Sequence, residues 1–465
     1  MATRQVKGIK LSRSAGASCL LAAALFAQQP ELIIIKETGP RSRRVNVAVL
    51  CDGYTAQEKD KCVGDMKFFS NAVVSKDPPL QLYAEYFNIY GIFAASKESG
   101  ADQNGVMKDT YFDAAYSPTL ARLLTISTTK AMAAIRLVLP EADMQFCVVN
   151  SEAYGGSGGQ VAVANRTTPA IVAHEVGHSF AKLGDEYDYA GASPWEAPNT
   201  TQQTVRERVK WTPWITPATP VPTPETAPYA ELMGLFEGAA YNATGWYRPK
   251  QNCRMKANGI PFCSVCAEAY ILTTYDKISP VDSVFPPNGA VIAFRSEPVT
   301  LTVSPMKPSS YALKIQWQVD GVSQAGATAP TFSQALAQGR HRVSAVVSDT
   351  TGLVRMDPLR LLSDTAAWEV DVSGVIGTLS GGPGGMGFSV VMADRQGLLF
   401  RLPNPGRYRV QVFTAGGQSL RNESGTGKAG LNALVWEAKA PLSPGPYLVV
   451  VEYQGRTASQ WRNIP

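Results

Sequence analysis

The sequence predicts a mixed α/β unit followed by two all-β sandwiches of the immunoglobulin type. Between residues 45 and 280, short apolar β-rich segments alternate with segments of helical character. After about residue 281 the helical periodicity disappears, and short alternating runs between Gly, Pro, Asp and Asn take over. The glycine-rich segment 380–387 divides these runs into two sets. We therefore expect units at 28–280, 281–373 and 388–465, each with a core of its own.

The first 27 residues have the layout of a secretory signal peptide. Basic residues without acidic ones lead into the apolar run ASCLLAAALFA, which ends at Ala27. The run is too short to span a bilayer as a stable helix, so no stable membrane insertion is expected. A buried N-terminal helix is the alternative. The favoured interpretation predicts a secreted protein, extracellular or periplasmic.

Composition sets further limits. Hydrophobic residues make up 45% of the 465 residues and charged residues 17%, which is typical of a globular protein. The formal net charge is +5 and no Lys/Arg cluster stands out, so no nucleic acid partner is expected.

Beyond residue 27 the cysteines are Cys51, Cys62, Cys147, Cys253, Cys263 and Cys266. The last three could suggest a structural zinc, but no fourth Cys or His lies close by, which favours a local disulfide.

The first unit begins with a strand-helix-strand pattern. Residues 45–54 (VNVAVLCDGY), 87–96 (FNIYGIFAAS) and 144–151 (MQFCVVNS) are β-rich and apolar, so each predicts a strand. Thr55 and Glu58 have the spacing of a capping box, which predicts a helix starting there. This order of elements predicts a mainly parallel sheet.

A second helix is predicted over residues 170–183, after a strand at 161–165. Thr168 has the chemistry of an N-cap, and Pro169 suits the first turn because its missing N–H costs nothing there. Gly184 is a natural stop signal.

The predicted helix carries the pattern HEVGHSFAKLGDEY at 174–187. His174 and His178 are four residues apart, so they share one face of the helix and can bind one zinc ion together. Glu175 is rotated by about 100° from His174, which places it beside the metal as a general base for a bound water. The third histidine, His341, falls in a predicted sandwich strand and is expected at the surface.

A third protein ligand is needed, and the residues leave a carboxylate, a tyrosine or a cysteine open. Asp185 is the favoured candidate. A straight helix from His178 would add about 10 Å of rise, so the chain must turn back near Gly184. Glu196 lies in a segment without helical character and is a weaker candidate, while Glu186 and Asp188 are held in reserve.

The pattern resembles the motif of the IgA-peptidase family, which comprises secreted bacterial zinc endopeptidases of the metzincin-like type. Further matching segments occur in order along residues 45–275: DGYTAQE at 52–58, YGGSGG at 154–159, GLFEGAAY at 234–241, YRPKQNCRM at 247–255 and FCSVC at 262–266. The resemblance implies a metzincin-like catalytic domain with zinc bound by His174 and His178, catalysis by Glu175, and an acidic ligand at Asp185. It also implies a methionine turn at Met255. Ala181 replaces the glycine usual in metzincins.

These observations predict a secreted zinc-dependent endopeptidase that hydrolyses protein or peptide substrates with a metal-activated water and Glu175 as the base. Tyr187 or Tyr247 is a candidate for stabilising the oxyanion, and residues 154–159 are interpreted as the rim of the cleft. The alternative is a catalytically inactive, protease-like adhesion protein. In either case the C-terminal sandwiches are candidates for surface or glycan contact.

Overall fold

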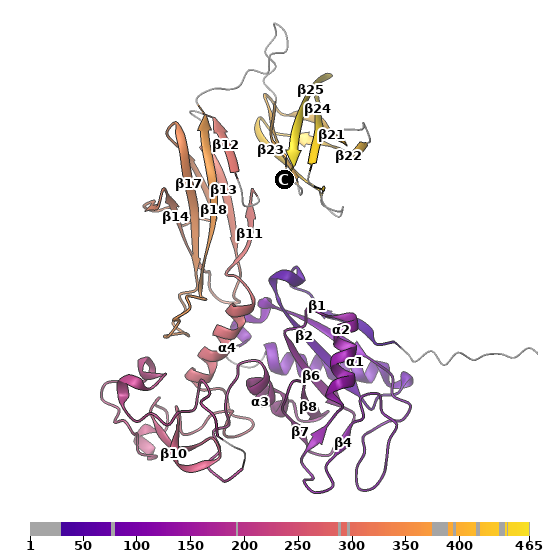
Figure 1. Ribbon diagram of the computed structural model, residues 1–465, viewed down its shortest axis with the longest axis vertical. Helices are drawn as coiled ribbons and strands as arrows, with labels where there is room; N and C mark the ends of the chain where they lie inside the picture. Colours follow the sequence, from indigo (N-terminus) through magenta and orange to yellow (C-terminus); the bar gives the residue numbers. More distant parts are fainter. Residues whose placement is uncertain are drawn as a thin grey trace, which may run out of the picture.

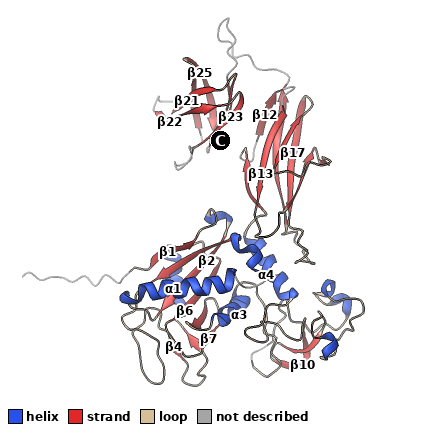
Figure 2. Ribbon diagram, turned by 180° about the vertical axis from the view of Figure 1, so that it is seen from behind, coloured by secondary structure: helices blue, strands red, loops and turns tan. Residues whose placement is uncertain are grey.

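The structure is a computed structural model that describes residues 29–75, 80–191, 194–286, 290–294, 298–373, 389–393, 397–414, 419–436, 442–443 and 445–464. The predicted signal peptide and the glycine-rich segment 380–387 lie outside these ranges. Strands outnumber helices, and the α-helices gather in the N-terminal part of the chain, below the two groups of strands that follow (Figure 2).

A six-stranded mixed sheet organises the N-terminal part. Its strands lie in the order β1 (Glu31–Lys36), β3 (Phe87–Phe93), β2 (Val45–Asp52), β6 (Met144–Val149), β8 (Ala162–Asn165) and β7 (Gly156–Ser157). The four central strands run parallel, whereas β1 and β7 pair antiparallel at the two edges. The predicted strands and their mainly parallel arrangement are thus confirmed.

Helices cover both faces of this sheet. On one face lie α1 (Lys59–Ser70) and α3 (Pro169–Ser179), and on the other lies α2 (Thr128–Val138). Every residue of β2 is therefore buried: Val47 and Val49 join one apolar cluster, and Ala48 and Leu50 join the other. The expected capping interaction precedes α1, where the carboxylate of Glu58 accepts a hydrogen bond from the Thr55 N–H at 3.0 Å.

Loops and short elements dominate residues 194–263, which lead into helix α4 (Ser264–Lys277). A hairpin of β9 (Phe236–Ala239) and β10 (Asn242–Arg248) lies in this region, at the lower left of Figure 1. The remaining short elements of the N-terminal part are η1 (Arg41–Arg43), η2 (Ala56–Glu58), η3 (Asn71–Ser75), η4 (Leu80–Tyr86), β4 (Ala115–Tyr116), β5 (Leu124–Thr125), η5 (Arg206–Arg208), η6 (Thr212–Trp214) and η7 (Ala227–Tyr229).

Two sheets follow α4 and enclose an apolar layer. One contains β11 (Val281–Phe285), β13 (Pro298–Pro305) and β16 (Thr331–Ala335). The other has the order β12 (Ala290–Phe294), β18 (Ser363–Ser373), β17 (Gly339–Ser348), β14 (Lys314–Val319) and β15 (Val322–Ser323). Trp317 and Trp368 stack between them with ring centroids 5.6 Å apart, and both are buried. We call this pair of sheets the first sandwich.

The first sandwich shares its core with the N-terminal part. One continuous cluster of buried residues reaches from β2 through α4 to Trp317 and Trp368. At the junction the buried carboxylate of Asp349 accepts hydrogen bonds from the hydroxyls of Tyr83, at 2.7 Å, and Tyr275, at 2.9 Å. The expectation of separate cores therefore does not hold here.

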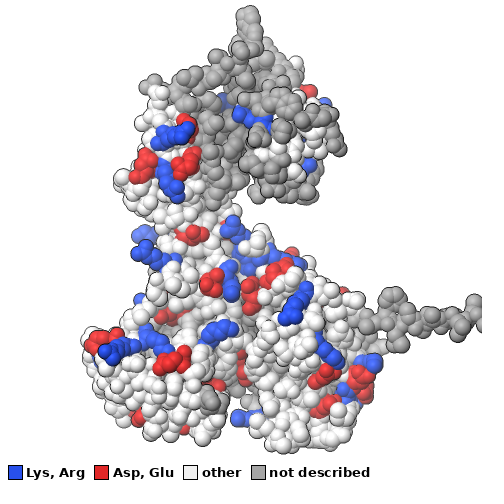
Figure 3. All heavy atoms as spheres, viewed as in Figure 1, with Lys and Arg blue, Asp and Glu red and all other residues white. Residues whose placement is uncertain are grey.

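The C-terminal strands have their own buried cluster, which includes Phe400, Val410 and Val449. One of their sheets has the order β19 (Ser389–Ala393), β20 (Gly397–Leu402) and β23 (Gly430–Val435). The other has the order β22 (Ser419–Gly427), β21 (Gly406–Thr414), β24 (Gly445–Tyr453) and β25 (Arg456–Ile464). On the face shown in Figure 3, basic and acidic side chains of the described residues are interspersed. Within the described ranges, none of the helices has the length and apolarity needed to cross a bilayer.

The cysteines differ from the sequence-based expectation. Cys51 and Cys62 form a disulfide between β2 and α1. Cys253, Cys263 and Cys266 are buried and unbridged, so the local disulfide expected among them is not formed. Their thiols instead converge with a carboxylate from a distant part of the chain, which is described below.

Candidate metal centre

Helix α3 presents the two histidines, and the chain after it differs from the prediction. Thr168 occupies the N-cap position without a side-chain hydrogen bond to the helix, and Pro169 fills the first turn. The helix ends at Ser179, four residues earlier than expected. The reversal lies at Lys182, which adopts a left-handed φ of +56°, and the Leu183 N–H donates back to the Gly177 carbonyl at 3.0 Å.

Gly184 does not form the turn; a glycine is needed there because the backbone passes close to Ala197. A Cβ atom at this position would lie 2.9 Å from the Cβ of Ala197. The Gly184 N–H and C=O both bond to the side-chain amide of Asn199, at 2.7 and 2.9 Å. This pairing fixes the segment that carries Asp185.

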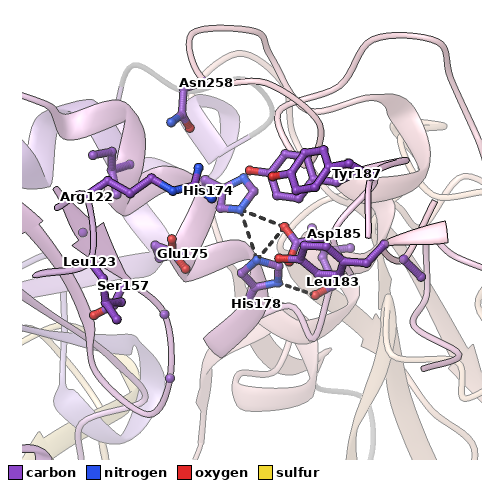
Figure 4. A pocket seen from close by; sticks show the side chains of 18 of the residues that line it. Arg122, Leu123, Ser157, His174, Glu175, His178, Leu183, Asp185, Tyr187 and Asn258 are labelled. Carbon is purple, nitrogen blue, oxygen red and sulfur yellow. Dashed lines mark hydrogen bonds and ion pairs between the residues drawn. The ribbon is translucent and has the colours of Figure 1, made fainter. Parts of the chain in front are cut away.

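The folded-back segment brings Asp185 to the two histidines. Asp185 Oδ1 lies 3.2 Å from His174 Nε2 and 3.3 Å from His178 Nε2, and the two Nε2 atoms are 3.1 Å apart (Figure 4). All three side chains are largely buried. The three potential ligand atoms thus converge on one position, where a single metal ion could bind all of them.

Hydrogen bonds fix the orientation of both imidazoles. His174 Nδ1 bonds to the Arg254 carbonyl at 2.9 Å and His178 Nδ1 bonds to the Leu183 carbonyl at 2.7 Å. A carbonyl oxygen only accepts, so each Nδ1 carries a proton, and in the neutral ring each Nε2 keeps a lone pair that a metal ion can bind.

This arrangement fits a small divalent cation. Asp185 Oδ1 is buried without a hydrogen-bond partner, which costs free energy unless a cation binds it. Zinc bonds of about 2.0 to 2.2 Å to N and O in a tetrahedron require ligand atoms about 3.3 to 3.5 Å apart. The observed separations of 3.1 to 3.3 Å are within a few tenths of an ångström of that requirement.

Glu175 lies beside these atoms on the wall of a cavity of about 530 Å³. Burial raises the pKa of Glu175, and the charge of Asp185 adds to this, against the opposing effect of the two histidines. A Cβ added to Gly158 would come within 2.5 Å of Glu175 Oε2, so the carboxylate sits directly against that glycine. The side chain therefore lies on the cavity wall between Gly158 and the two histidines, to which one of its oxygens lies within 4.8 Å.

The edge strand β7 and its glycines form one rim of this cavity. Gly156, Ser157, Gly158 and Gly159 line it, as the interpretation of residues 154–159 predicted. The opposite wall is aromatic and includes Tyr187, Tyr189, Tyr241 and Trp195. Tyr247, the other candidate for stabilising an oxyanion, lies on β10 and is not among the lining residues.

Sequence reasoning missed two polar residues of the site. The Tyr241 hydroxyl donates to Asp185 Oδ2 at 2.7 Å, so the carboxylate is held through its second oxygen. Arg122 brings a guanidinium to the cavity wall, where a hydrogen bond with Tyr189 raises the pKa of the arginine. Both come from loops remote in sequence from 174–187. Tyr241 ends the segment GLFEGAAY, which carries part of the family resemblance but gave this tyrosine no role, and no signal marks Arg122.

The other candidate residues have different partners. Met255 is buried with its sulfur against Gly177 of α3, where an added Cβ would meet it at 2.9 Å. Asp188 pairs with Lys256 at 3.3 Å and Glu196 with Lys210 at 2.6 Å. His341 lies on β17 and bonds to Asp320 at 2.7 Å. Glu186, next to Asp185, points into the cysteine cluster.

Comparison with solved structures gives partial likenesses. The fibronectin(III)-like modules of CbhA from Clostridium thermocellum align with 20% of this chain and 95% of their own, at 17% identity and a TM-score of 0.15. A β-glucuronidase of Parabacteroides merdae aligns over 48% of this chain at 11% identity and a TM-score of 0.20. The glycan-locus protein SGBP-B of Bacteroides ovatus aligns over 39% at 11% identity and 0.15.

The chain spans 28% and 47% of the length of the last two proteins, and similarities of this size carry no argument about this protein. No curated protein matches the chain. The family described as IgA Peptidase M64 matches residues 33–231 and 225–273, which include the sheet, α3, Asp185 and the three clustered cysteines. Since this match covers more than half of the chain, the protein belongs to the IgA peptidase M64 family.

Proposed function

We propose that the protein is a secreted zinc-dependent endopeptidase with a metzincin-like α/β catalytic domain and two immunoglobulin-like sandwiches. The observation that carries this proposal is the convergence of His174, His178 and Asp185 beside Glu175 in a cavity bounded by a strand edge. In this proposal the three converging residues hold the zinc ion and Glu175 remains free for proton transfer. Export rests on the signal-peptide pattern at 1–27.

Bound zinc would polarise the scissile carbonyl and make water more acidic at this site. Glu175 would accept the proton of the attacking water at Oε2 and later deliver it to the leaving amine. Burial raises the pKa of Glu175 towards neutral pH, and a group whose pKa lies nearer the working pH is a more effective acid and base. Tyr241 would hold Asp185 in place through Oδ2, and Tyr187, which lines the cavity, would donate to the developing oxyanion.

A peptide substrate would bind in extended form along the rim formed by residues 156–159. The β7 strand is the last strand of the sheet in this direction, although part of its outer side is occupied where the Gly156 N–H donates to the Arg122 carbonyl at 3.0 Å. The aromatic wall opposite would contact substrate side chains. The sandwiches remain candidates for contact with a surface or a glycan.

Substitution of Glu175 tests this function. Glu175→Gln preserves the size of the side chain but removes the base, so we expect zinc content to be unchanged and the cleavage rate to fall by at least about two orders of magnitude. Activity would be measured on a fluorescently labelled unfolded protein, with zinc quantified by mass spectrometry. Glu152→Gln is the matched control, because that glutamate side chain is 81% exposed and lies outside the cavity.

A full rate for Glu175→Gln would refute the assigned role. An inactive wild-type protein that nevertheless contains zinc would favour the alternative of a protease-like adhesion protein.

A further inference from the structure

A second group of metal-ligating side chains lies outside the proposed catalytic machinery. Glu186, Cys253, Cys263 and Cys266 are all buried, and one potential ligand atom of each lies within 4.8 Å of the others. The Sγ atoms of Cys253 and Cys266 are 3.6 Å apart, and Cys266 Sγ is 3.4 Å from Glu186 Oε1. The fourth potential ligand, which is not apparent near the cysteines in the sequence, is a glutamate from the segment after α3.

The geometry differs from that of a disulfide. A disulfide requires sulfur atoms about 2.05 Å apart, whereas Cys253 and Cys266 are separated by 3.6 Å. In a tetrahedral zinc site with Zn–S bonds of about 2.3 Å, neighbouring sulfur atoms are about 3.8 Å apart, and sulfur and carboxylate oxygen are about 3.5 Å apart. The observed distances of 3.6 and 3.4 Å follow the second pattern.

The surroundings are suited to thiolates and to a bound carboxylate. Cys263 is the N-cap of α4 and Cys266 lies in its first turn, where the helix dipole favours negative charge. The Cys263 N–H donates to Cys253 Sγ at 3.3 Å. Asn199 donates to Glu186 Oε1 at 2.9 Å, which orients the carboxylate.

Glu186 provides an independent indication of a ligand. The residue is 0% exposed, and its Oε2 atom is buried without a hydrogen-bond partner. A buried carboxylate oxygen left unpaired costs free energy, and charges buried in proteins are normally paired or bound to a metal. The unpaired oxygen belongs to the same carboxylate that faces the three thiols.

We propose that Glu186, Cys253, Cys263 and Cys266 bind a second zinc ion with a structural role. Cys263 and Cys266 lie at the start of a helix, and Cys253 lies ten residues before Cys263, so the three cysteines supply soft sulfur ligands. Glu186 brings the number of protein ligands to four. Four protein ligands in a fully buried position leave no place for a substrate, which distinguishes this site from the one beside Glu175.

The second site would fix the catalytic ligand next to it. Glu186 follows Asp185 directly, and the Glu186 N–H donates to the Met255 carbonyl at 2.9 Å. A metal that ties Glu186 to Cys253 would therefore clamp the Asp185 segment against the turn at Met255. This consequence rests on the proposed function, whereas the presence of the second zinc does not.

Metal analysis of purified full-length variants tests the proposal. We expect two zinc ions per wild-type chain, one in His174→Ala, and one in Cys263→Ser, while Cys147→Ser keeps both because that buried cysteine lies on β6 away from the cluster. X-ray absorption at the zinc edge of His174→Ala, which retains the cysteine site, should show sulfur neighbours at about 2.3 Å. This spectrum needs no cysteine substitution, so it holds even if Cys263→Ser fails to fold.

Three results would overturn the second site. The first is zinc in His174→Ala with only nitrogen and oxygen neighbours, and the second is no zinc at all in that variant. The third is an intact mass, measured without reductant, that shows a disulfide involving Cys253, Cys263 or Cys266. Failure of the proposed catalytic site would look different, because zinc with sulfur neighbours would persist in a protein without peptidase activity.

Discussion

Substitution of Gly158 by alanine should impair catalysis while leaving the fold intact. The added Cβ would lie 2.5 Å from Glu175 Oε2, whereas ordinary contacts begin at about 3.4 Å, so the carboxylate must move by about 0.9 Å. Gly158 is exposed and its φ is outside the left-handed region, so alanine itself introduces no backbone strain. The atom that must move is the end of a flexible side chain, so the cost in stability is small.

The catalytic cost follows from the displacement. A misplacement of about 1 Å in a reacting group lowers rates by about 10²-fold, equivalent to about 2.7 kcal/mol of transition-state stabilisation. We therefore expect kcat/KM of Gly158→Ala to fall about 100-fold on a fluorescently labelled unfolded protein. Zinc content and the thermal unfolding midpoint should match the wild type, since the proposed ligands His174, His178 and Asp185 are not displaced directly.

Gly64→Ala is the matched control. This glycine lies in α1, where no atom would lie within 4 Å of the added Cβ, so its activity should equal that of the wild type. Gly158→Ala with wild-type kcat/KM would refute the reasoning, because the position of Glu175 Oε2 would then not matter for proton transfer. A loss of zinc together with activity would instead assign the effect to the metal site.

Three further predictions concern the ligand and the junction. Asp185→Ala should lose one zinc ion and all measurable cleavage, as judged by metal analysis and the peptidase assay, and retention of both ions would move the third ligand elsewhere. Tyr241→Phe removes the hydrogen bond at 2.7 Å to Asp185, so zinc affinity or activity should fall about 10- to 100-fold in a chelator competition; an unchanged affinity would contradict this role. Asp349→Ala removes the acceptor of two buried tyrosine hydroxyls and should lower the free energy of unfolding by about 3 kcal/mol in urea titrations. Hydrogen bonds to a charged group contribute about 1.5 to 3 kcal/mol each, and part of this loss is offset because the two tyrosines can still bond to Tyr86 and Tyr311. A change below about 1 kcal/mol would mean that the junction is not formed through this carboxylate.

The local pattern was sufficient to predict the sheet and helix α3. Apolar β-rich runs became β2, β3, β6 and β8, and the His174–His178 spacing placed both rings on one side of the helix. These features depend on short-range periodicity, which a single sequence records directly. The zinc site could be proposed for the same reason.

The turn after α3 was predicted at the wrong residue. Glycine is favoured in the left-handed region, so Gly184 was the natural choice, but Lys182 adopts that conformation. Burial of Leu183 and its hydrogen bond to Gly177 compensate for the strain, since left-handed backbone costs a non-glycine residue about 1 kcal/mol. Tertiary contacts of this kind are not visible in the sequence.

The cysteine cluster was misassigned for a related reason. Cys253, Cys263 and Cys266 are close in sequence, but the carboxylate that faces them belongs to Glu186, far upstream. Glu186 was considered only as a reserve ligand for the other site, because it adjoins Asp185. Neighbouring residues in an extended segment point to opposite sides, so the two carboxylates serve different clusters.

Helix α4 joins two features that were described separately. Its first turn carries Cys266, and its last turn carries Tyr275, which bonds to Asp349 of the first sandwich. Gene rearrangement that exchanged this sandwich for an unrelated domain would remove the buried acceptor of Tyr275 on α4 and of Tyr83 on η4, so inheritance of the two parts should be linked. Among the described residues the C-terminal strands have a buried core of their own, so recombination could replace or duplicate them with less effect on the rest of the chain.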